Sequence, residues 1–330
     1  MTKPVAVVTG GAGFIGSHMV DRLIAEGFTV RVIDDLSGGL SANLAHLRDE
    51  PSLSVDVADI RNLGPTSSVF DGARYVLHFA GIGDIVPSIE RPTDYMSVNV
   101  QGTVRMLEAS RQNRVNRFVY AASSSCYGLA TTPTDENQPI DCRYPYALSK
   151  HLGEQAAMHW GRVYGLPVNS IRIFNAYGVR SRTTGAYGAV FGVFLRQKIA
   201  GRPFTVVGDG TQRRDFLYVT DVVDAFFRAC TTPHTARIWN LGAGAPQTVN
   251  RLVKLLGGNV EYIPKRPGEP DCTWADITRI CADLGWKPRV SFEDGVAMML
   301  ADIGRWKDAP LWDKSTIAAA TQKWFEFLRN

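Results

Sequence analysis

Cysteine is scarce in this 330-residue sequence, and its five copies form no Cys-x-x-Cys pair. An odd number of cysteines without that spacing offers neither a disulfide framework nor a zinc site, so we expect buried, reduced thiols. Long apolar runs are absent too, since none approaches the roughly 20 residues that a membrane helix needs. The opening MTKPVAVVTGG lacks the basic-then-apolar layout of a signal peptide. We therefore expect a cytoplasmic protein with no membrane partner.

Blocks of one charge sign are also missing. The 36 Lys and Arg and 32 Asp and Glu residues leave a formal net charge of +4, dispersed along the chain. Without a basic block or a basic-aromatic alternation, nucleic acid is not expected as a partner. The six histidines show neither a His-x-His nor a His-Glu-x-x-His spacing, so no metal site is predicted. What remains is a globular chain whose 45% hydrophobic content can fill a large core.

Short β-branched runs alternate with helical patterns through the first half of the sequence. The predicted strands are 5–9, 29–34, 52–55, 75–80, 117–123 and 168–174, and the predicted helices are 14–26, 94–112 and 146–163. This rhythm indicates an α/β fold, a doubly wound parallel Rossmann sheet that binds ligands at the carboxyl ends of its strands. We expect this domain over residues 1–172. A smaller mixed α/β substrate-binding lobe follows over 173–330, with the chain crossing between the lobes, and a helix over 314–328 packs onto the body.

The motif TGGAGFIG (9–16) lies directly between the first predicted strand and the first predicted helix. It places Gly10, Gly13 and Gly16 where a tight turn lets the backbone approach a pyrophosphate. The phosphate charge then meets unpaired helix N–H groups and the positive end of the helix dipole. Together with an acid at the end of the second strand, the motif predicts dinucleotide binding.

That acid is Asp34, backed by Asp35. A carboxylate at this position can bind both hydroxyls of an adenosine ribose. A 2′-phosphate about 4 Å away would cost on the order of 4 kcal/mol at an effective dielectric near 20, which favours NAD over NADP. Asp59 and Ile60, just past the third predicted strand, are placed to flank the adenine, although a solvated loop acid explains Asp59 equally well.

The stretch RYPYALSK (143–150) sets Tyr146 and Lys150 four residues apart, on one helix face, whereas Tyr144 is not so placed. A nearby ammonium lowers the pKa of a phenol toward that of a general base, so we expect Lys150 to activate Tyr146. Ser123, in YAASSSCYG (120–128) at the end of the fifth predicted strand, is placed to bind the hydroxyl that Tyr146 deprotonates. An isolated Tyr-x-x-x-Lys pair is more often a surface feature, and this second motif argues against that interpretation.

With these residues the sequence resembles the extended short-chain dehydrogenases/reductases, specifically the NAD-dependent nucleotide-sugar 4-epimerases. The motifs that carry the resemblance run over nearly the whole chain: TGGAGFIG, HFAG (78–81), NVQGT (99–103), RIFNAYG (172–178), GDGTQRRDF (208–216) and RPGEPD (266–271). The resemblance implies that the cofactor contacts include Phe14, Ile15, Phe79, Ala80, Gly81, Tyr146 and Lys150. It implies that the substrate contacts are Ser124, Ser125, Asn175, Arg182, Arg214, Arg266 and Glu269.

The resemblance also implies a mechanism. Tyr146 removes the hydroxyl proton at sugar carbon 4 while NAD takes the hydride, and the 4-keto sugar turns and receives the hydride on its other face. In 4,6-dehydratases and decarboxylases the catalytic Ser is followed by an acid within two residues, where this chain has Ser124 and Ser125. Those reactions are the weaker alternative. The NADPH-dependent keto-reductase branch is disfavoured by Asp34, and Cys126 fits a buried packing thiol better than a catalytic one.

The sugar itself is less well defined by the sequence. The window GVRSRTTGAYGAVFG (178–192) should line the sugar pocket. The resemblance implies that Arg182 stands where uronic-acid 4-epimerases bind a carboxylate, so UDP-glucuronate is an alternative to a UDP-hexose. Against it, the Asn175 position is often Thr in those enzymes, and a solvated arginine or a phosphate contact explains Arg182 as well. Asp84 stands where relatives carry Lys or Gln, and it fits either a contact to sugar hydroxyls or a helix cap.

Two further expectations concern assembly and class. Similarity to the family suggests a homodimer built on the helices that begin near Asp94 and Tyr146. The apolar residues Tyr95, Met96, Leu148 and Leu152 are compatible with it, and core packing explains the same residues. Some proteins with this fold bind NAD only as redox-sensing regulators. The retained catalytic residues argue against that second class.

Overall fold

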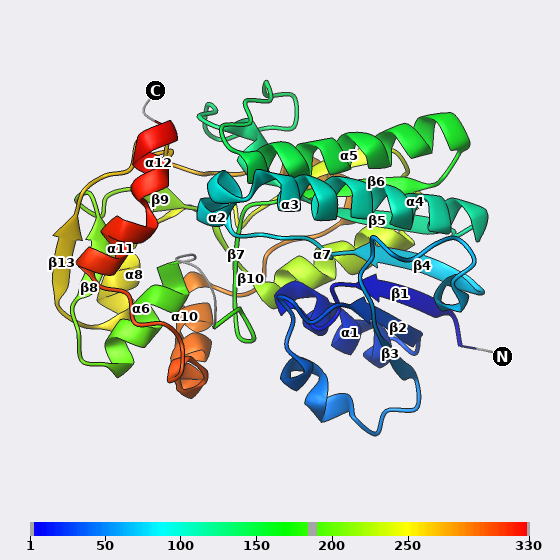
Figure 1. Cartoon of the computed structure of the whole chain (residues 1–330), viewed down its shortest axis with the longest axis horizontal. Coiled ribbons are helices and arrows are strands. Elements are labelled where there is room, and N and C mark those ends of the chain that lie inside the picture. Colours follow the sequence, from blue (N-terminus) through cyan, green and yellow to red (C-terminus); the bar gives the residue numbers. More distant parts are fainter. Residues whose placement is uncertain (1–2, 184–189, 329–330) are drawn as a thin grey trace.

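Seven parallel strands form the central sheet of the larger lobe (Figure 1). The computed structural model describes residues 3–183 and 190–328. The sheet order is β11-β6-β5-β4-β1-β2-β3. Its strands are β1 Val5–Thr9, β2 Thr29–Asp34, β3 Leu53–Val57, β4 Ala73–His78, β5 Arg117–Ser123, β6 Val168–Ile173 and β11 Arg237–Leu241. The six strands predicted from the sequence are all present, three with the predicted bounds and three with ends shifted by one or two residues, and the predicted α/β Rossmann fold is confirmed.

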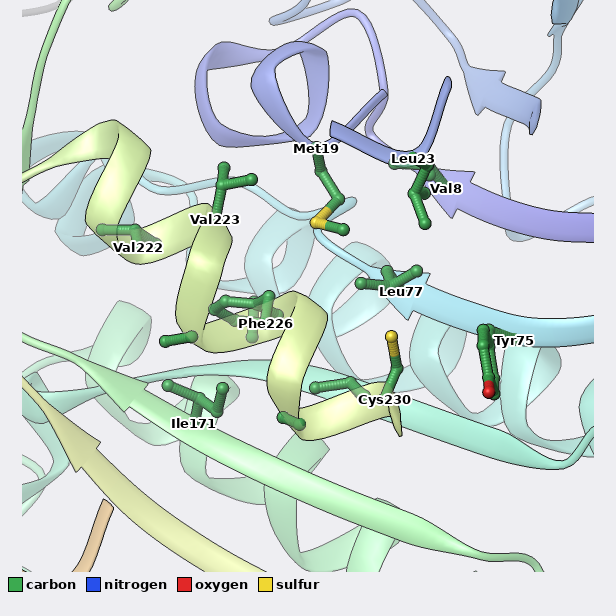
Figure 2. Close-up of a cluster of buried hydrophobic side chains, with 14 of the residues drawn as sticks. Val8, Met19, Leu23, Tyr75, Leu77, Ile171, Val222, Val223, Phe226 and Cys230 are labelled. Atoms are coloured by element: carbon green, nitrogen blue, oxygen red, sulfur yellow. The ribbon is translucent and has the colours of Figure 1, made fainter. Parts of the chain in front are cut away.

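Helices cover both faces of the sheet, because strands buried on both sides need an apolar layer above and below. The helices of one face are α1 Phe14–Ala25 and α7 Val219–Thr231, and those of the other are α4 Thr103–Gln112 and α5 Pro145–Tyr164. Figure 2 shows the first of these layers, where Met19 of α1 and Phe226 of α7 point toward Leu77 and Ile171 of the sheet. All four side chains are fully buried.

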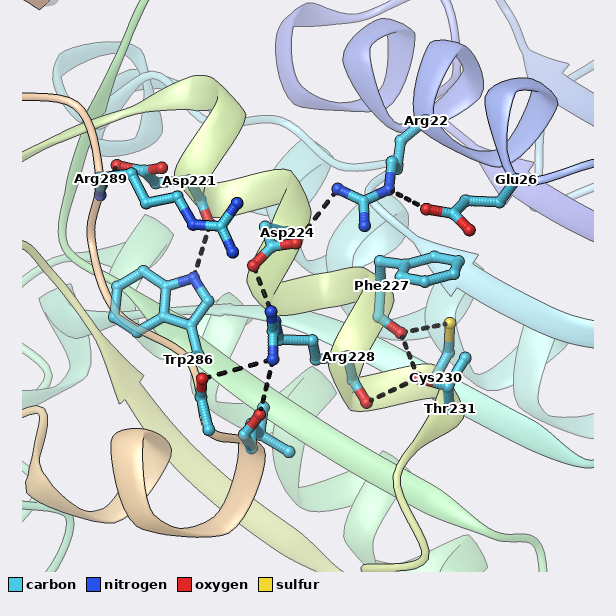
Figure 3. A network of polar contacts seen from close by, with 12 residues as sticks. Arg22, Glu26, Asp221, Asp224, Phe227, Arg228, Cys230, Thr231, Trp286 and Arg289 are labelled. Atoms are coloured by element: carbon cyan, nitrogen blue, oxygen red, sulfur yellow. Dashed lines mark hydrogen bonds and ion pairs between the residues drawn. The ribbon is translucent and has the colours of Figure 1, made fainter.

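The sheet takes its last strand from beyond residue 172. β11 pairs in parallel with β6, and α7 precedes it on the sheet's face. Figure 3 shows how α7 is held: Asp224 accepts from Arg22 of α1 at 3.1 Å and from Arg228 at 2.7 Å. The division into residues 1–172 and 173–330 stays a prediction, and the larger lobe contains at least one strand from the second range.

The smaller lobe is a mixed α/β unit, as predicted. Its strands form three pairs: β7 Asn175–Tyr177 with β10 Phe216–Tyr218, β8 Phe204–Val207 with β13 Val260–Ile263, and β9 Arg213–Arg214 with β12 Gln247–Thr248. Besides α7, the helices after β7 are α6 Val190–Ile199, α8 Val249–Leu256, α9 Thr278–Leu284, α10 Phe292–Ala301, α11 Lys314–Ala320 and α12 Gln322–Phe327. Of these, α9 packs on β11 of the larger lobe. The separate core of the smaller lobe includes the ring of Trp324, which supports the expected packing of the final stretch.

Two helices differ from the predictions. The stretch 94–112 is not a single α-helix, because α3 Pro92–Met96 is joined to α4 by a π-helical segment, Ser97–Gly102. Within this segment the side-chain amide of Asn99 accepts a hydrogen bond from the N–H of Ile82 and donates one to the carbonyl of Ile82. The stretch 314–328 breaks at Thr321, whose buried hydroxyl donates to the carbonyl of Ile317 at 2.8 Å. Over residues 3–183 and 190–328, no helix is long and apolar enough to cross a membrane.

Candidate active site

The glycine turn after β1 is packed too tightly for side chains. Gly10 has a φ of +69°, and a Cβ there would lie 2.7 Å from the amide nitrogen of Ala80. A Cβ on Gly16 would lie 2.1 Å from the carbonyl oxygen of Gly10. Gly13 is the N-cap residue of α1 and has no side chain that could bind the first N–H groups of the helix. The turn therefore leaves the N–H groups at the start of α1 for an anion, which is the arrangement that a dinucleotide pyrophosphate needs.

Asp34 ends β2 beside this turn and is 6% exposed. Its carboxylate accepts hydrogen bonds from the amides of Ala12 and Leu36, both at 2.9 Å. Burial raises the pKa of Asp34, and these two bonds act against the rise. The oxygens retain lone pairs for ribose hydroxyls. Asp35 is exposed and instead caps its own turn by accepting from Ser37.

The two residues predicted to flank the adenine are otherwise engaged. The Asp59 carboxylate binds the Arg61 guanidinium, with one oxygen 2.9 Å from Nε, and this bond lowers the pKa of Asp59. The Ile60 side chain is 5% exposed and packs in the core between the sheet and α4. A cofactor contact of Asp59 and Ile60 stays a prediction.

The segment after β4 connects the glycine turn to Lys150. His78 is fully buried between the hydroxyls of Thr9 at 2.7 Å and Thr103 at 2.9 Å, and burial lowers its pKa to about 3, so it is neutral. Thr9 accepts in turn from the amide of Ala80 at 3.2 Å. A Cβ on Gly81 would lie 3.8 Å from Nζ of Lys150. Residues 79–81 thus pass between the turn and the lysine, with the Phe79 ring directed at Phe226, 4.7 Å away.

Ser123, Tyr146 and Lys150 come together as predicted. Ser123 is the last residue of β5, and its side chain is hydrogen-bonded to the Tyr146 phenol. Pro145 opens α5, where its missing N–H costs nothing, so Tyr146 and Lys150 occupy successive turns on one face. Lys150 is 8% exposed, with its ammonium 4.6 Å from the centre of the Tyr120 ring. The carboxyl ends of β1, β4 and β5 therefore meet at one edge, beside the Tyr146 phenol, the Lys150 ammonium and the glycine turn.

The expected effect of Lys150 on the pKa of Tyr146 is wrong for the protein alone. Burial raises the pKa of Tyr146, the bond to Ser123 lowers it, and the charge of Asp84 raises it further. Burial also lowers the pKa of Lys150 itself, to about 8. The desolvation of the phenol outweighs its favourable contacts, because a phenolate loses more hydration than a single neutral hydrogen bond restores.

Glu154 continues the same helix face, one turn past Lys150, and its charge raises the lysine pKa against burial. It is 1% exposed and is bound by the buried guanidinium of Arg172, with Nη2 of the arginine 2.6 Å from Oε1. Arg172 also donates to the Tyr127 hydroxyl at 2.7 Å. This pair was not singled out from the sequence. The i, i+4, i+8 spacing of Tyr146, Lys150 and Glu154 is the signal that could have revealed it.

Three of the predicted substrate residues form one cluster in the smaller lobe. Glu269 lies between two arginines, with Oε1 accepting from Arg214 at 2.7 Å and Oε2 3.4 Å from Nε of Arg266. All three side chains are at most 25% exposed. Asn175 of β7 accepts from Thr273 at 2.6 Å. A pair of guanidinium groups held by one carboxylate suits a diphosphate, because arginine donates in a fork that matches phosphate oxygens.

Ser124 and Ser125 lie in the 3-10 helix Ser124–Tyr127 that follows β5. The Ser125 amide donates to Oγ of Ser123 at 3.2 Å, and its side chain is hydrogen-bonded to the Tyr144 phenol. Tyr144 in turn contacts Trp324 of α12, with ring centres 5.7 Å apart. The Trp324 indole donates to the carbonyl of Pro267, next to Arg266, at 2.8 Å. The role of Trp324 was missed because nothing local in the sequence links α12 to this loop.

Arg182 and Asp84, which were considered separately in the sequence, form an ion pair with Nη1 2.6 Å from Oδ2. Asp84 precedes α2 Ile85–Glu90 but makes no side-chain cap hydrogen bond, so the helix-cap alternative is wrong. Residues 184–189 of the predicted sugar window lie outside the described residues. The site residues taken from the sequence thus fall into four groups: the glycine turn with Asp34, the set of Ser123, Tyr146 and Lys150, the cluster of Arg214, Glu269 and Arg266, and this ion pair.

Comparison with known proteins gives consistent results. The family model described as the NAD dependent epimerase/dehydratase family matches residues 6–242. The UDP-glucose 4-epimerase of Mycolicibacterium smegmatis is 35% identical over 300 residues, covering 88% of this chain and 96% of that protein. The UDP-glucuronic acid decarboxylase 2 of Arabidopsis thaliana is 31% identical over 329 residues, covering 96% and 72%. The structure of UDP-glucuronic acid 4-epimerase from Bacillus cereus, in complex with UDP-glucuronic acid and NAD, has a TM-score of 0.85 at 27% identity, covering 91% of this chain and 99% of that one.

Proposed function

Because the chain belongs to the NAD-dependent epimerase/dehydratase family, we propose that it epimerises a nucleotide-diphosphate sugar at carbon 4, with a UDP-hexose as substrate. The observation that carries the proposal is the set of Ser123, Tyr146 and Lys150 at the carboxyl end of β5. It lies on the sheet edge that also carries the glycine turn and Asp34. A sugar hydroxyl bound at this edge would lie close both to the Tyr146 base and to the dinucleotide site.

In this proposal Tyr146 takes the proton from the oxygen on carbon 4, and Ser123 donates a hydrogen bond to the same oxygen. NAD, when bound, supplies the hydride acceptor and donor, and its positively charged nicotinamide favours the phenolate form of the base. Lys150, charged at pH 7 with its pKa of about 8, is placed to bind the nicotinamide ribose. Tyr146 returns the proton to the sugar oxygen after the 4-keto sugar has turned, so no net oxidation occurs.

The cluster of Arg214, Glu269 and Arg266 supports a nucleotide diphosphate as the fixed part of the substrate. Binding at the diphosphate leaves the sugar free to rotate, which transfer to its opposite face requires. Asn175 of β7, whose side-chain oxygen accepts from Thr273, is a further proposed contact to the diphosphate. Phe14, Ile15, Phe79 and the main chain at Asp59 and Ile60 complete the proposed cofactor contacts.

Three other reactions of the family remain as second candidates. Dehydration or decarboxylation would need an acid near Ser123, and the next two side chains here are the hydroxyls of Ser124 and Ser125. Epimerisation of UDP-glucuronate is favoured by one observation, the guanidinium of Arg182 close to the catalytic edge. A purely regulatory NAD-binding protein would have no use for the diphosphate cluster.

The test is direct. Purified protein is incubated with a panel of UDP-, dTDP-, CDP- and GDP-sugars, and the products are identified by NMR. We expect a 4-epimer of a UDP-hexose, formed at least about 100-fold more slowly by Tyr146→Phe. A dehydrated or decarboxylated product would replace the proposal with one of the alternatives, and NAD binding without turnover would support the regulatory class.

A homodimer and a cytoplasmic location belong to the same proposal. The dimer is supported by Leu148 and Leu152 on α5, which are 40% and 39% exposed one turn apart. The location is supported by the cysteines, all five of which are free thiols. The molar mass in solution, from light scattering, tests the dimer.

A further inference from the structure

The ion pair of Arg182 and Asp84 joins the two lobes. Asp84 belongs to the larger lobe, at the start of α2, and Arg182 follows β7 in the smaller lobe. The two side chains are 25% and 40% exposed, so both face solvent in part. Within residues 3–183 and 190–328, Arg182 is the hydrogen-bonding partner of the Asp84 carboxylate.

Tyr95 places this pair next to the catalytic base. Its hydroxyl donates to the main-chain oxygen of Asp84 at 2.6 Å, and its ring meets that of Tyr146 edge-on with centres 6.4 Å apart. Tyr95 is fully buried and therefore fixes the distance between Asp84 and the base. The charge of Asp84 reaches the phenol, since it contributes to raising the pKa of Tyr146.

The pair matters for the sugar because charge near a half-exposed site selects among ligands by repulsion as well as attraction. A lone arginine beside Tyr146 would attract a carboxylate at the end of the sugar. Here the Arg182 guanidinium is already paired with the Asp84 carboxylate, so the pair has no net charge. A uronic acid would gain no net attraction from the pair, and its carboxylate would be repelled by that of Asp84. A hydroxymethyl group at carbon 6 meets no such repulsion.

We propose that Asp84 is a specificity-determining residue: by neutralising Arg182 it directs the enzyme to nucleotide sugars with an uncharged carbon 6 and against uronic acids. This inference rests on the proposed function, because it assigns the substrate class of that same site. The Asp84 carboxylate alone would then decide between a UDP-hexose and UDP-glucuronate as the substrate.

The experiment measures equilibrium binding of UDP-glucose and UDP-glucuronate by calorimetry, and kcat/KM for both, in five proteins. Wild type should bind UDP-glucose more tightly. Asp84→Asn, which keeps the shape and removes the charge, should raise the affinity for UDP-glucuronate relative to UDP-glucose by at least about tenfold. Asp84→Asn combined with Arg182→Leu should lose that gain, because the attracting cation is gone. Asp84→Ser serves as a second charge-removing variant in case Asp84→Asn does not fold.

The matched control is Glu293→Gln. It breaks the ion pair of Arg251 with Glu293, which has the same 2.6 Å length and side chains 40% and 49% exposed, on α8 and α10. The ratio of the two affinities should not change in this variant.

The inference is overturned if wild type binds UDP-glucuronate as tightly as UDP-glucose, or binds neither. It is equally overturned if both charge-removing variants keep the wild-type ratio. The proposed function fails separately, when wild type binds UDP-glucose yet forms no 4-epimer; the affinity ratio then still decides the role of Asp84.

Discussion

The rings of Tyr144 and Tyr146 lie nearly parallel, with an interplanar angle of 6° and centres 6.5 Å apart. Two phenols so close together have different partners, since Tyr146 is hydrogen-bonded to Ser123 and Tyr144 to Ser125. Only the first partner ends a strand of the sheet. Tyr144 is therefore a matched control for the assignment of Tyr146 as the base.

Tyr146→Phe should lower kcat by about 100- to 10,000-fold, the range typical of a lost general base. Tyr144→Phe removes one neutral hydrogen bond and should cost less than about tenfold. Steady-state kinetics on the same nucleotide sugar compares the two. Equal losses would mean that the phenols act as a unit and that the assignment of the base to Tyr146 is wrong.

The pH dependence of kcat should carry the signature of Asp84. The base works as phenolate, so kcat rises with pH up to the pKa of Tyr146 in the complex. The Asp84 charge raises that pKa. Asp84→Asn should consequently move the rising limb of the profile to lower pH, while Glu293→Gln leaves it in place. A shift to higher pH would contradict the charge relationship.

Lys150→Met should make the protein more stable and inactive. The pKa of Lys150 is lowered from 10.5 to about 8 by burial. At pH 7 the lysine is charged in the folded and unfolded states, so the fold bears the full desolvation cost, and methionine should raise the free energy of unfolding by up to roughly 3 kcal/mol.

The difference in the free energy of unfolding between wild type and Lys150→Met should shrink as pH rises from about 8 toward 10.5. In this range the unfolded wild type binds more protons than the folded form, so the wild type gains stability with pH. Urea unfolding of protein stripped of nucleotide measures it. A destabilised Lys150→Met at pH 7 would show that the contact with the Tyr120 ring matters more than desolvation.

Asp34→Asn should relax the choice of cofactor. The carboxylate repels a 2′-phosphate, so its loss should narrow the preference for NAD over NADP by at least about tenfold, measured by fluorescence titration. Asp35→Asn is the control, because Asp35 is exposed and binds Ser37. An unchanged preference in Asp34→Asn would place the discrimination elsewhere.

Arg214→Leu should weaken nucleotide-sugar binding by at least about tenfold while NAD binding stays unchanged, since a charge-assisted contact to phosphate is removed. The neighbouring Arg213, which donates to the carbonyl of Pro246, provides the control Arg213→Leu. UDP alone serves as the titrant, so the result is independent of the sugar. An equal loss of affinity for UDP and for NAD would indicate that the substitution disorders the smaller lobe.

Much of the fold and of the catalytic set was predictable from the sequence, because the decisive signals are local. The glycine turn, Asp34 and the Tyr146/Lys150 step each lie within a few residues of a strand end or on a single helix. Parallel strands then bring these ends to one edge without further information.

What the sequence did not reveal depends on contacts between distant segments. The Arg182–Asp84 pair joins positions 98 residues apart, and neither residue's neighbours indicate the other. The direction of the Tyr146 pKa shift was missed for a related reason: spacing predicts that the lysine lies near the phenol, whereas the burial that raises the pKa of Tyr146 depends on the packing of distant segments around it.

The position of β11 has a consequence for how this protein is made. The edge of the parallel sheet beside β6 is completed by Arg237–Leu241, after the chain has already run through α6, β8 and β10 of the other lobe. Domains generally fold in order as they emerge during synthesis. Here the nucleotide-binding lobe must wait with an open edge until part of its neighbour has been translated, so the two lobes mature together and neither should be obtainable intact by cutting the chain near residue 172.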